Sequence, residues 1–128
     1  MHKTTVIASW ILRITGLVQL VLGLLFWTGH GLQFIPLHIS NGFLFVLALW
    51  TIAGAALFGT TRRGLALFAI VWGIAMIAFG VTQARILIGS LHWLVRLTHL
   101  LMAFASFAIA GRLMPVEAPR RSRTAVAA

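Results

Sequence analysis

The chain has 128 residues, of which 61% are hydrophobic and 9% are charged, and its mean hydropathy is +1.05. Soluble domains carry roughly 25% charged residues, so this composition excludes an ordinary soluble protein and indicates an integral membrane protein. Ten Lys and Arg residues stand against a single acidic side chain, that of Glu117, which gives a formal net charge of +9.

Four apolar segments follow one another along the chain, and each is long enough to span a membrane, which takes about 20 residues. We predict spans at about residues 6–28, 37–59, 64–84 and 92–114, which form one domain, 1–114, ahead of a flexible basic tail at 115–128. The first segment is too long for a signal peptide and lacks a small-residue cleavage site, so we expect it to remain as a helix. The predicted fold class is all-α, a polytopic membrane protein built as a four-transmembrane-helix bundle.

The basic residues outside the spans indicate the orientation of this bundle. Lys3, Arg62, Arg63 and Arg112 fall on one side of it, together with the arginines of the tail, whereas Arg85 falls on the other side. Cytoplasmic loops collect Lys and Arg, so we expect both termini to be cytoplasmic and the protein to lie in a bacterial inner membrane. Nucleic-acid binding would need a basic face on a soluble module, and no such module is predicted.

Three histidines lie in or beside the predicted spans, where ionisable groups are candidates for function. Counting about 1.5 Å per residue from the basic side places His38 and His92 near the outer interface and His99 about 10 Å deeper. In the last span, polar and small residues recur at steps of three and four, so they share one helix face, which we expect to look into the bundle. This stripe consists of His92, Arg96, His99, Ala103, Ser106 and Ala110.

A short internal repeat relates the two halves of the chain. The segment Gly16–Gln19 resembles Gly80–Gln83, and the segment around His38 resembles the segment around His99. Such a repeat predicts two parallel helical hairpins related by an axis along the membrane normal, with the two histidines facing each other across the bundle. Small residues on the same faces either let the helices approach closely or leave room for a flat ligand.

Two facing imidazoles among small residues suit a b-type haem, whose iron takes neutral histidine nitrogens as axial ligands. We therefore predict that His38 and His99 bind haem b, and that Arg96 and Arg85 pair with its propionates. His92 is the main competitor as a ligand, and otherwise it hydrogen-bonds a propionate or anchors the interface. The other residues expected around the cofactor are Gly42, Gln19 and Gln83.

Other metal sites are less favoured by the residue types present. A zinc site normally adds a carboxylate to its histidines, and the spans contain none. Copper bound by histidine and Met102 stays open, although thioether sites usually gather several methionines close in sequence. The chain contains no cysteine, which excludes thiolate metal sites and covalently attached c-type haem.

Several of these residues also have purely structural interpretations. His30 and His92 flank spans at the interface, where such side chains are ordinary anchors. Gln19 and Gln83 are suited to interhelical hydrogen bonds. Arg13 lies about two turns from the predicted cytoplasmic surface, so we expect it to extend toward that surface.

The placement of His38 and His99 within their helices resembles the four-helix membrane cytochromes b, whose haems lie between histidines on transmembrane helices. That resemblance implies one haem at most, because a two-haem member would carry a second histidine pair toward the inner side. The phrases Gly16–Gly29 and Pro36–His38, and His92-Trp93 followed by His99, also resemble a group of small bacterial four-helix membrane proteins. This second likeness implies the fold and no particular activity.

The function that these observations predict is electron transfer by a single haem b in the outer half of the bundle, exchanging electrons with quinone or a partner complex. The alternative is an accessory or assembly subunit without a cofactor, whose polar stripe packs helices and whose partner is a larger membrane complex or another copy of the chain. Membrane lipid is a partner in either case. A proton-coupled or cation-coupled carrier is disfavoured, because such carriers usually need an intramembrane carboxylate.

Overall fold

The computed structural model describes residues 2–59 and 62–114, and within these ranges it contains four long helices and two short 3-10 turns. The helices are α1 (His2–Trp27), α2 (Ile35–Gly59), α3 (Arg63–Thr82) and α4 (His92–Leu113), and the turns are η1 (Leu32–Phe34) and η2 (Gln83–Arg85). All four helices are long and apolar enough to cross a membrane. The predicted all-α four-helix bundle is therefore confirmed, whereas Thr60–Thr61 and the predicted tail lie outside the described residues.

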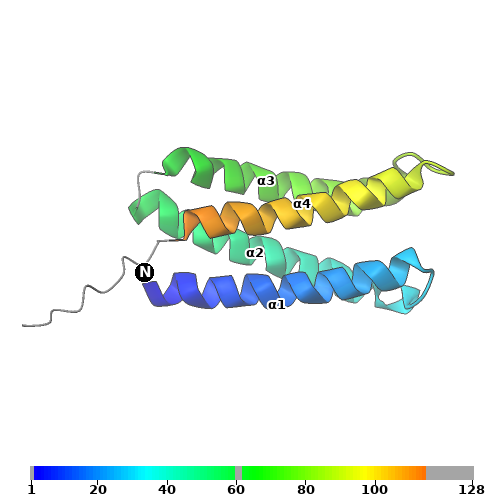
Figure 1. Cartoon of the computed structure of the whole chain (residues 1–128), viewed down its shortest axis with the longest axis horizontal. Helices are drawn as coiled ribbons and strands as arrows, with labels where there is room; N and C mark the ends of the chain where they lie inside the picture. The colour runs from blue at the N-terminus through cyan, green and yellow to red at the C-terminus, as the bar shows by residue number, and fades with distance from the viewer. Residues whose placement is uncertain (1, 60–61, 115–128) are drawn as a thin grey trace, which may run out of the picture.

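Helices that follow each other in the chain run antiparallel, so α1 with α2 and α3 with α4 form two hairpins (Figure 1). The N-terminus, the connection between α2 and α3, and the end of α4 lie at one end of the bundle. We call this the basic end, because it holds Lys3, Arg62, Arg63 and Arg112. There the Arg62 guanidinium donates a hydrogen bond to the Arg112 carbonyl, which links the connection to α4. We call the opposite end, with the loops that contain η1 and η2, the histidine end.

The helix boundaries differ from the predicted spans for local reasons. α2 begins at Ile35 and includes Pro36, because a proline in the first turn lacks only an N–H group that has no partner there. α1 ends at two glycine positions in the left-handed region, with φ of 79° at Gly29 and 69° at Gly31. The His30 amide donates to the Leu25 carbonyl at 2.9 Å, which satisfies a carbonyl of the last turn.

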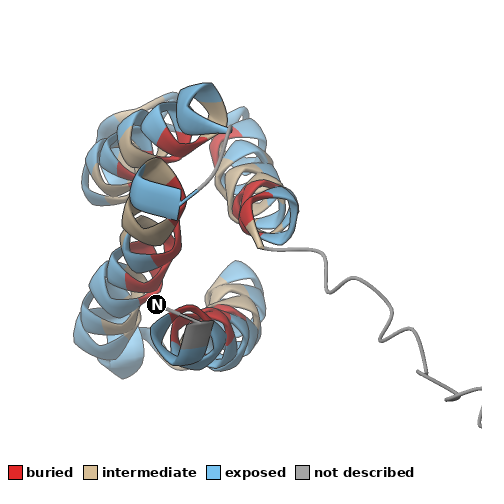
Figure 2. Ribbon diagram, turned by 90° about the vertical axis from the view of Figure 1, so that its left-hand side faces the viewer, coloured by how far each residue is buried: buried red, intermediate tan, exposed pale blue. Residues whose placement is uncertain are grey.

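The core lies along α2, which packs extensively against both α1 and α3, while α4 packs mainly against α3 (Figure 2). Its centre consists of small and aliphatic side chains with no exposed surface: Leu49, Ile52, Ala53, Ala66 and Ala69. Alanines at these positions let the helices approach closely. The outward faces are also apolar, and such large apolar surface is suited to contact with lipid.

Glycines form notches that receive aromatic side chains from neighbouring helices. The Phe107 ring of α4 sits directly on Gly16 of α1, and the Trp50 indole of α2 sits directly on Gly73 of α3. The Trp50 indole N–H donates to the Ile70 carbonyl at 3.1 Å, which ties α2 to α3. These small residues therefore serve close packing between helices.

A second tryptophan ties α3 to α4. The Trp72 indole N–H donates to the Ser106 hydroxyl oxygen at 3.1 Å. That hydroxyl in turn lies 3.0 Å from the Met102 carbonyl and 2.9 Å from the Met76 sulfur. The fully buried hydroxyl of Ser106 therefore has hydrogen-bond partners. At Ser106 the polar and small stripe of the last span faces into the bundle, as expected.

Candidate functional site: a histidine pair

His38 of α2 and His99 of α4 face each other near the histidine end of the bundle. Their ring centroids are 6.3 Å apart and their planes are inclined by 47°. Both side chains are partly buried. The predicted depth difference of about 10 Å was wrong, because the α3–α4 hairpin extends further than the α1–α2 hairpin at this end (Figure 1).

All four helices contribute to the surroundings of the pair. Phe26 of α1 contacts His38 edge-on with centroids 5.3 Å apart, and Phe79 of α3 stacks on His99 at 6.0 Å with an interplanar angle of 14°. A Cβ atom added at Gly80 would lie 3.3 Å from Cε1 of His99, so this glycine leaves room for the imidazole. The pair is thus enclosed between aromatic rings at a point where the four helices converge.

Each histidine of the pair has one nitrogen without a partner. The Nδ1 atoms of His38 and His99 are both buried and form no hydrogen bond. Buried polar atoms in proteins almost always have a partner, because an unpaired one costs about 1–3 kcal/mol. Two orphaned nitrogens in adjacent rings therefore mark the pair as a candidate ligand site.

The two rings are close enough to bind one metal ion together. A bond from a metal to an imidazole nitrogen is about 2 Å long, so two imidazoles that share one ion have ring centres about 5–6 Å apart. The observed separation is 6.3 Å. Among the described residues there is no group of three or more His, Cys, Asp or Glu side chains that could hold a bare ion.

Gln19 and Gly42, two of the residues predicted around the cofactor, take part in a contact between α1 and α2. The Asn41 amide donates to the Gln19 side-chain oxygen at 3.0 Å and to the Thr15 carbonyl at 2.8 Å. The Gln19 amide also covers Gly42, where an added Cβ would lie 2.9 Å from its nitrogen. This cluster lies one helical turn further into the bundle than His38, and it fills the space that Gly42 was expected to leave for a ligand.

The remaining predicted residues lie around the histidine end, outside the pair. His92 Nδ1 lies 3.1 Å from the Ile86 carbonyl, so this imidazole fastens the loop between α3 and α4, in which Leu87 has a φ of 46°. Gln83 is partly buried in η2, while Arg85 and Arg96 are exposed. The expectation that Arg96 looks into the core was wrong, because its side chain lies at the flank of α4.

This flank of α4 faces α1 across a seam where the two helices make few contacts. We define the α1–α4 seam by the Phe107 ring on Gly16 and by the residues on the same two helix faces. Arg96 and Ala103 precede Phe107 by eleven and four residues, so all three share one face of α4. Gly23 follows Gly16 by seven residues on α1, and a Cβ added there meets nothing within 4 Å. Between the Phe107 contact and Arg96 the seam therefore holds the small residues Gly23 and Ala103, together with Leu20 and Leu100 on the same faces.

Residues that complete the surroundings of the pair escaped the sequence analysis for a simple reason. Phe26 and Phe79 are two of nine phenylalanines in an apolar chain, so nothing in the sequence distinguished them. Asn41, in contrast, was recognisable from the sequence as a polar residue at the outer end of the second span, three positions after His38 and so on the same helix face.

Arg13 is a charged residue within the first span. It lies on α1, nearer the basic end than the histidine pair. It is exposed, and its guanidinium carbon lies 5.4 Å from the centre of the Trp10 ring. An arginine at the centre of a membrane helix costs about 2.5–3.5 kcal/mol, whereas a cation–π contact at an exposed site returns about 0.5–1 kcal/mol. The contact with Trp10 therefore offsets only part of the cost.

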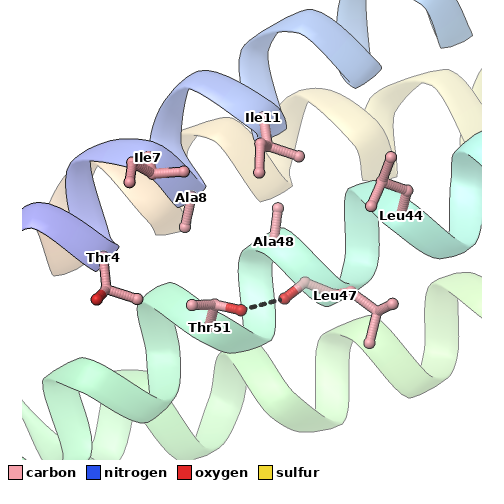
Figure 3. Close-up of a pocket in the computed structure, with 8 residues that line it drawn as sticks. All are labelled: Thr4, Ile7, Ala8, Ile11, Leu44, Leu47, Ala48 and Thr51. Carbon is pink, nitrogen blue, oxygen red and sulfur yellow. Dashed lines mark hydrogen bonds between the residues drawn. The ribbon is translucent and has the colours of Figure 1, made fainter.

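The described residues also form a groove of about 230 Å³ between α1 and α2 (Figure 3). Its lining is almost entirely apolar and includes Ile7, Ala8, Ile11 and Leu44. The Thr51 hydroxyl at its edge donates to the Leu47 carbonyl at 2.8 Å and is thus occupied within α2. With no polar group directed into it, the groove is suited to apolar contact and offers no chemistry.

Comparison of the chain with models of protein families, with curated proteins and with solved structures gives no match. The function therefore has to be argued from the residues of the chain itself.

Proposed function

We propose that the protein is a membrane-embedded electron-transfer protein in which His38 and His99 bind one haem b. The observation that carries the proposal is the pair of facing imidazoles, 6.3 Å apart, with two buried and unpartnered nitrogens. A porphyrin supplies four equatorial nitrogens, so its iron needs only two protein ligands. A pair without a third histidine or carboxylate among the described residues suits that requirement better than it suits a bare ion.

The α1–α4 seam provides the most suitable surroundings for a macrocycle. Gly42 and Gly80 are already covered by Gln19 and His99, so they leave no room for it. Gly23 borders open space and Ala103 is small, and both lie on the faces that meet at the seam. Arg96 on the same face of α4, with Arg85 in the adjacent loop, would pair with the propionates through charge-assisted hydrogen bonds.

The protein would act chiefly by holding this ligand pair in an apolar setting. When bound, haem b supplies a reversible one-electron couple. His38 and His99 would hold its iron, while Phe26 and Phe79 would keep water from the two imidazole rings. Exchange of electrons with quinone or with a partner complex completes the proposed activity.

The direct test is an absorption spectrum of the purified protein in detergent, recorded oxidised and reduced after expression with a supply of haem precursor. The proposal expects the sharp reduced bands of a low-spin haem at one haem per chain. A colourless protein that does not take up added haem would refute it. The accessory-subunit alternative would then be favoured if defined membrane subunits co-purify with the chain.

We further propose that the basic end faces the cytoplasm of a bacterium and that the protein lies in its inner membrane. The support is the location of Lys3, Arg62, Arg63 and Arg112 at one end of the bundle, since cytoplasmic loops collect such residues. Reporter fusions after Arg63 and at the C-terminus should therefore be active as cytoplasmic reporters, and a fusion at Gly31 should be active outside. Reporters with the opposite pattern would place the histidine pair toward the cytoplasm.

The proposed pairing of Arg96 with a haem propionate gives a further prediction. Replacing Arg96 with leucine should speed the loss of haem by about tenfold or more, because a hydrogen bond to a charged group contributes about 1.5–3 kcal/mol. The measurement is the rate of haem transfer to an excess of apomyoglobin. Arg13→Leu is the matched control, since Arg13 lies on α1, nearer the basic end than the pair, and it should leave the rate unchanged. Equal acceleration in both variants would mean that the arginines act through folding.

A further inference from the structure

Arg13 lies close to the middle of its span. The apolar part of α1 runs from Val6 to Trp27, so its midpoint lies between residues 16 and 17 and Arg13 lies about one turn away, about 5 Å along the axis toward the basic end. Arg13 thus lies about two turns inside the predicted start of the span at residue 6.

The contacts across the bundle agree with this depth. Asn41 of α2 donates to the Thr15 carbonyl, so the level of residue 15 on α1 corresponds to the level of residue 41 on α2. The span of α2 runs from Leu32 to Gly59, and its midpoint lies only about one turn further along. From the level of Thr15 and Asn41, both Arg13 and the midpoint of the α2 span lie toward the basic end. Arg13 is therefore near the middle of both helices.

From this depth the guanidinium does not reach the phosphates of the lipid. The Trp10 contact draws it about one turn toward the basic end, to about 10 Å from the midpoint of the span. The hydrocarbon layer extends about 15 Å to each side of its centre. The charge thus stays within the hydrocarbon, exposed on the surface of the bundle.

The chain offers this charge no acidic partner. Its one acidic side chain, Glu117, follows the last span, so none of the four spans contains a carboxylate. A second copy of the chain would bring another arginine to the same depth and no acid. An acidic side chain that pairs with Arg13 would therefore have to belong to a different protein.

We infer that the Arg13 face of α1 is a docking surface for a transmembrane helix of another protein that carries an aspartate or glutamate near the middle of the membrane. The partner is identified by charge complementarity at matched depth, since charged groups within membranes pair with one another. This inference is independent of haem binding, because Arg13 and the histidine pair lie at different levels of the bundle.

The neighbouring surface is shaped for a helix. Arg13 precedes Gly16 by three residues, so it borders the α1–α4 seam on the side toward the basic end. On α4, Gly111 follows Phe107 by four residues, is exposed, and would meet nothing within 4 Å if it carried a Cβ. A small residue there permits close approach of a helix that packs beside Arg13 near the basic end.

The test uses labelled model helices in vesicles of phosphatidylcholine. Each helix is a 23-residue leucine-rich peptide with glutamate, leucine or lysine at its centre, and energy transfer to the labelled protein reports association. The wild-type protein should bind the glutamate helix about tenfold more tightly than the leucine helix. Arg13→Leu should lose that preference while unfolding at an unchanged or higher temperature, because it removes an exposed charge from the hydrocarbon.

A charge exchange makes the test specific. Arg13→Glu should prefer the lysine helix over the glutamate helix, and the control Lys3→Leu should behave like the wild type, since Lys3 lies at the basic end. Equal binding of the glutamate and leucine helices to the wild type would overturn the inference. So would enrichment of spin-labelled phosphatidylglycerol around the wild type but not around Arg13→Leu, because Arg13 would then be neutralised by lipid.

Discussion

Under the proposed haem binding, replacement of either His38 or His99 with alanine should abolish the low-spin haem spectrum. The reason is coordination, since a low-spin b-type haem needs an imidazole on each side of the iron, and the two rings are already positioned 6.3 Å apart. The loss should be complete in each single variant, because one imidazole leaves the iron five-coordinate and high-spin. The measurement is the reduced-minus-oxidised spectrum of protein expressed with a supply of haem precursor.

Controls distinguish loss of a ligand from loss of the fold. His30→Ala should keep the spectrum, because His30 is an exposed loop residue whose Nδ1 lies 3.1 Å from the Thr28 hydroxyl. His92→Ala should also keep it, because His92 pairs with the Ile86 carbonyl outside the pair. Free imidazole added to His99→Ala should restore the low-spin bands. If His92→Ala removes the spectrum and His99→Ala does not, the assigned ligand pair is wrong.

The substitution Gly73→Ala will lower the free energy of unfolding by about 1–2 kcal/mol. Alanine favours a helix over glycine by about 1 kcal/mol, but the added Cβ would meet the Trp50 indole and would lie 2.9 Å from the Val46 side chain. Overpacking of this kind costs about 1–3 kcal/mol, and displacing Trp50 also weakens its hydrogen bond to Ile70. Unfolding in mixed detergent micelles measures the change.

Gly54→Ala is the matched control for this substitution, because a Cβ at Gly54 of α2 meets nothing within 4 Å. It should leave stability unchanged or raise it by up to about 1 kcal/mol. The double variant Gly73→Ala with Trp50→Leu should be more stable than the sum of the two single changes implies, because the smaller side chain removes the clash. Strict additivity would show that Trp50 and Gly73 do not interact.

The fold was predictable from the sequence because four apolar runs of membrane length leave few alternatives in 128 residues. The meeting of His38 and His99 was predictable from the short repeat, which placed them at equivalent positions. Their relative depth was not, because it depends on how far one hairpin extends past the other, and residue counts within a helix contain no information on that offset. The exposure of Arg96 was missed for a related reason, since periodicity defines a face without telling which neighbour that face meets.

The glycines illustrate a second limit of sequence reasoning. Small residues at helical spacing were compatible with close packing and with a ligand space alike. The structure separates the two cases, because Gly16, Gly42 and Gly73 receive side chains whereas Gly23 borders open space. That outcome depends on which large side chain lies opposite each glycine, and it is decided by the register between helices.

The slight contact between α1 and α4 has a consequence for electron transfer under the proposed function. The two imidazoles belong to α2 and α4, which are joined through α3 by the Trp50 and Trp72 hydrogen bonds. The separation of the two rings is therefore set through α3 and not through the contact between α1 and α4. If haem is bound as proposed, a ligand pair held in this way would keep the reorganisation energy of electron transfer small, even though α1 makes few contacts with α4.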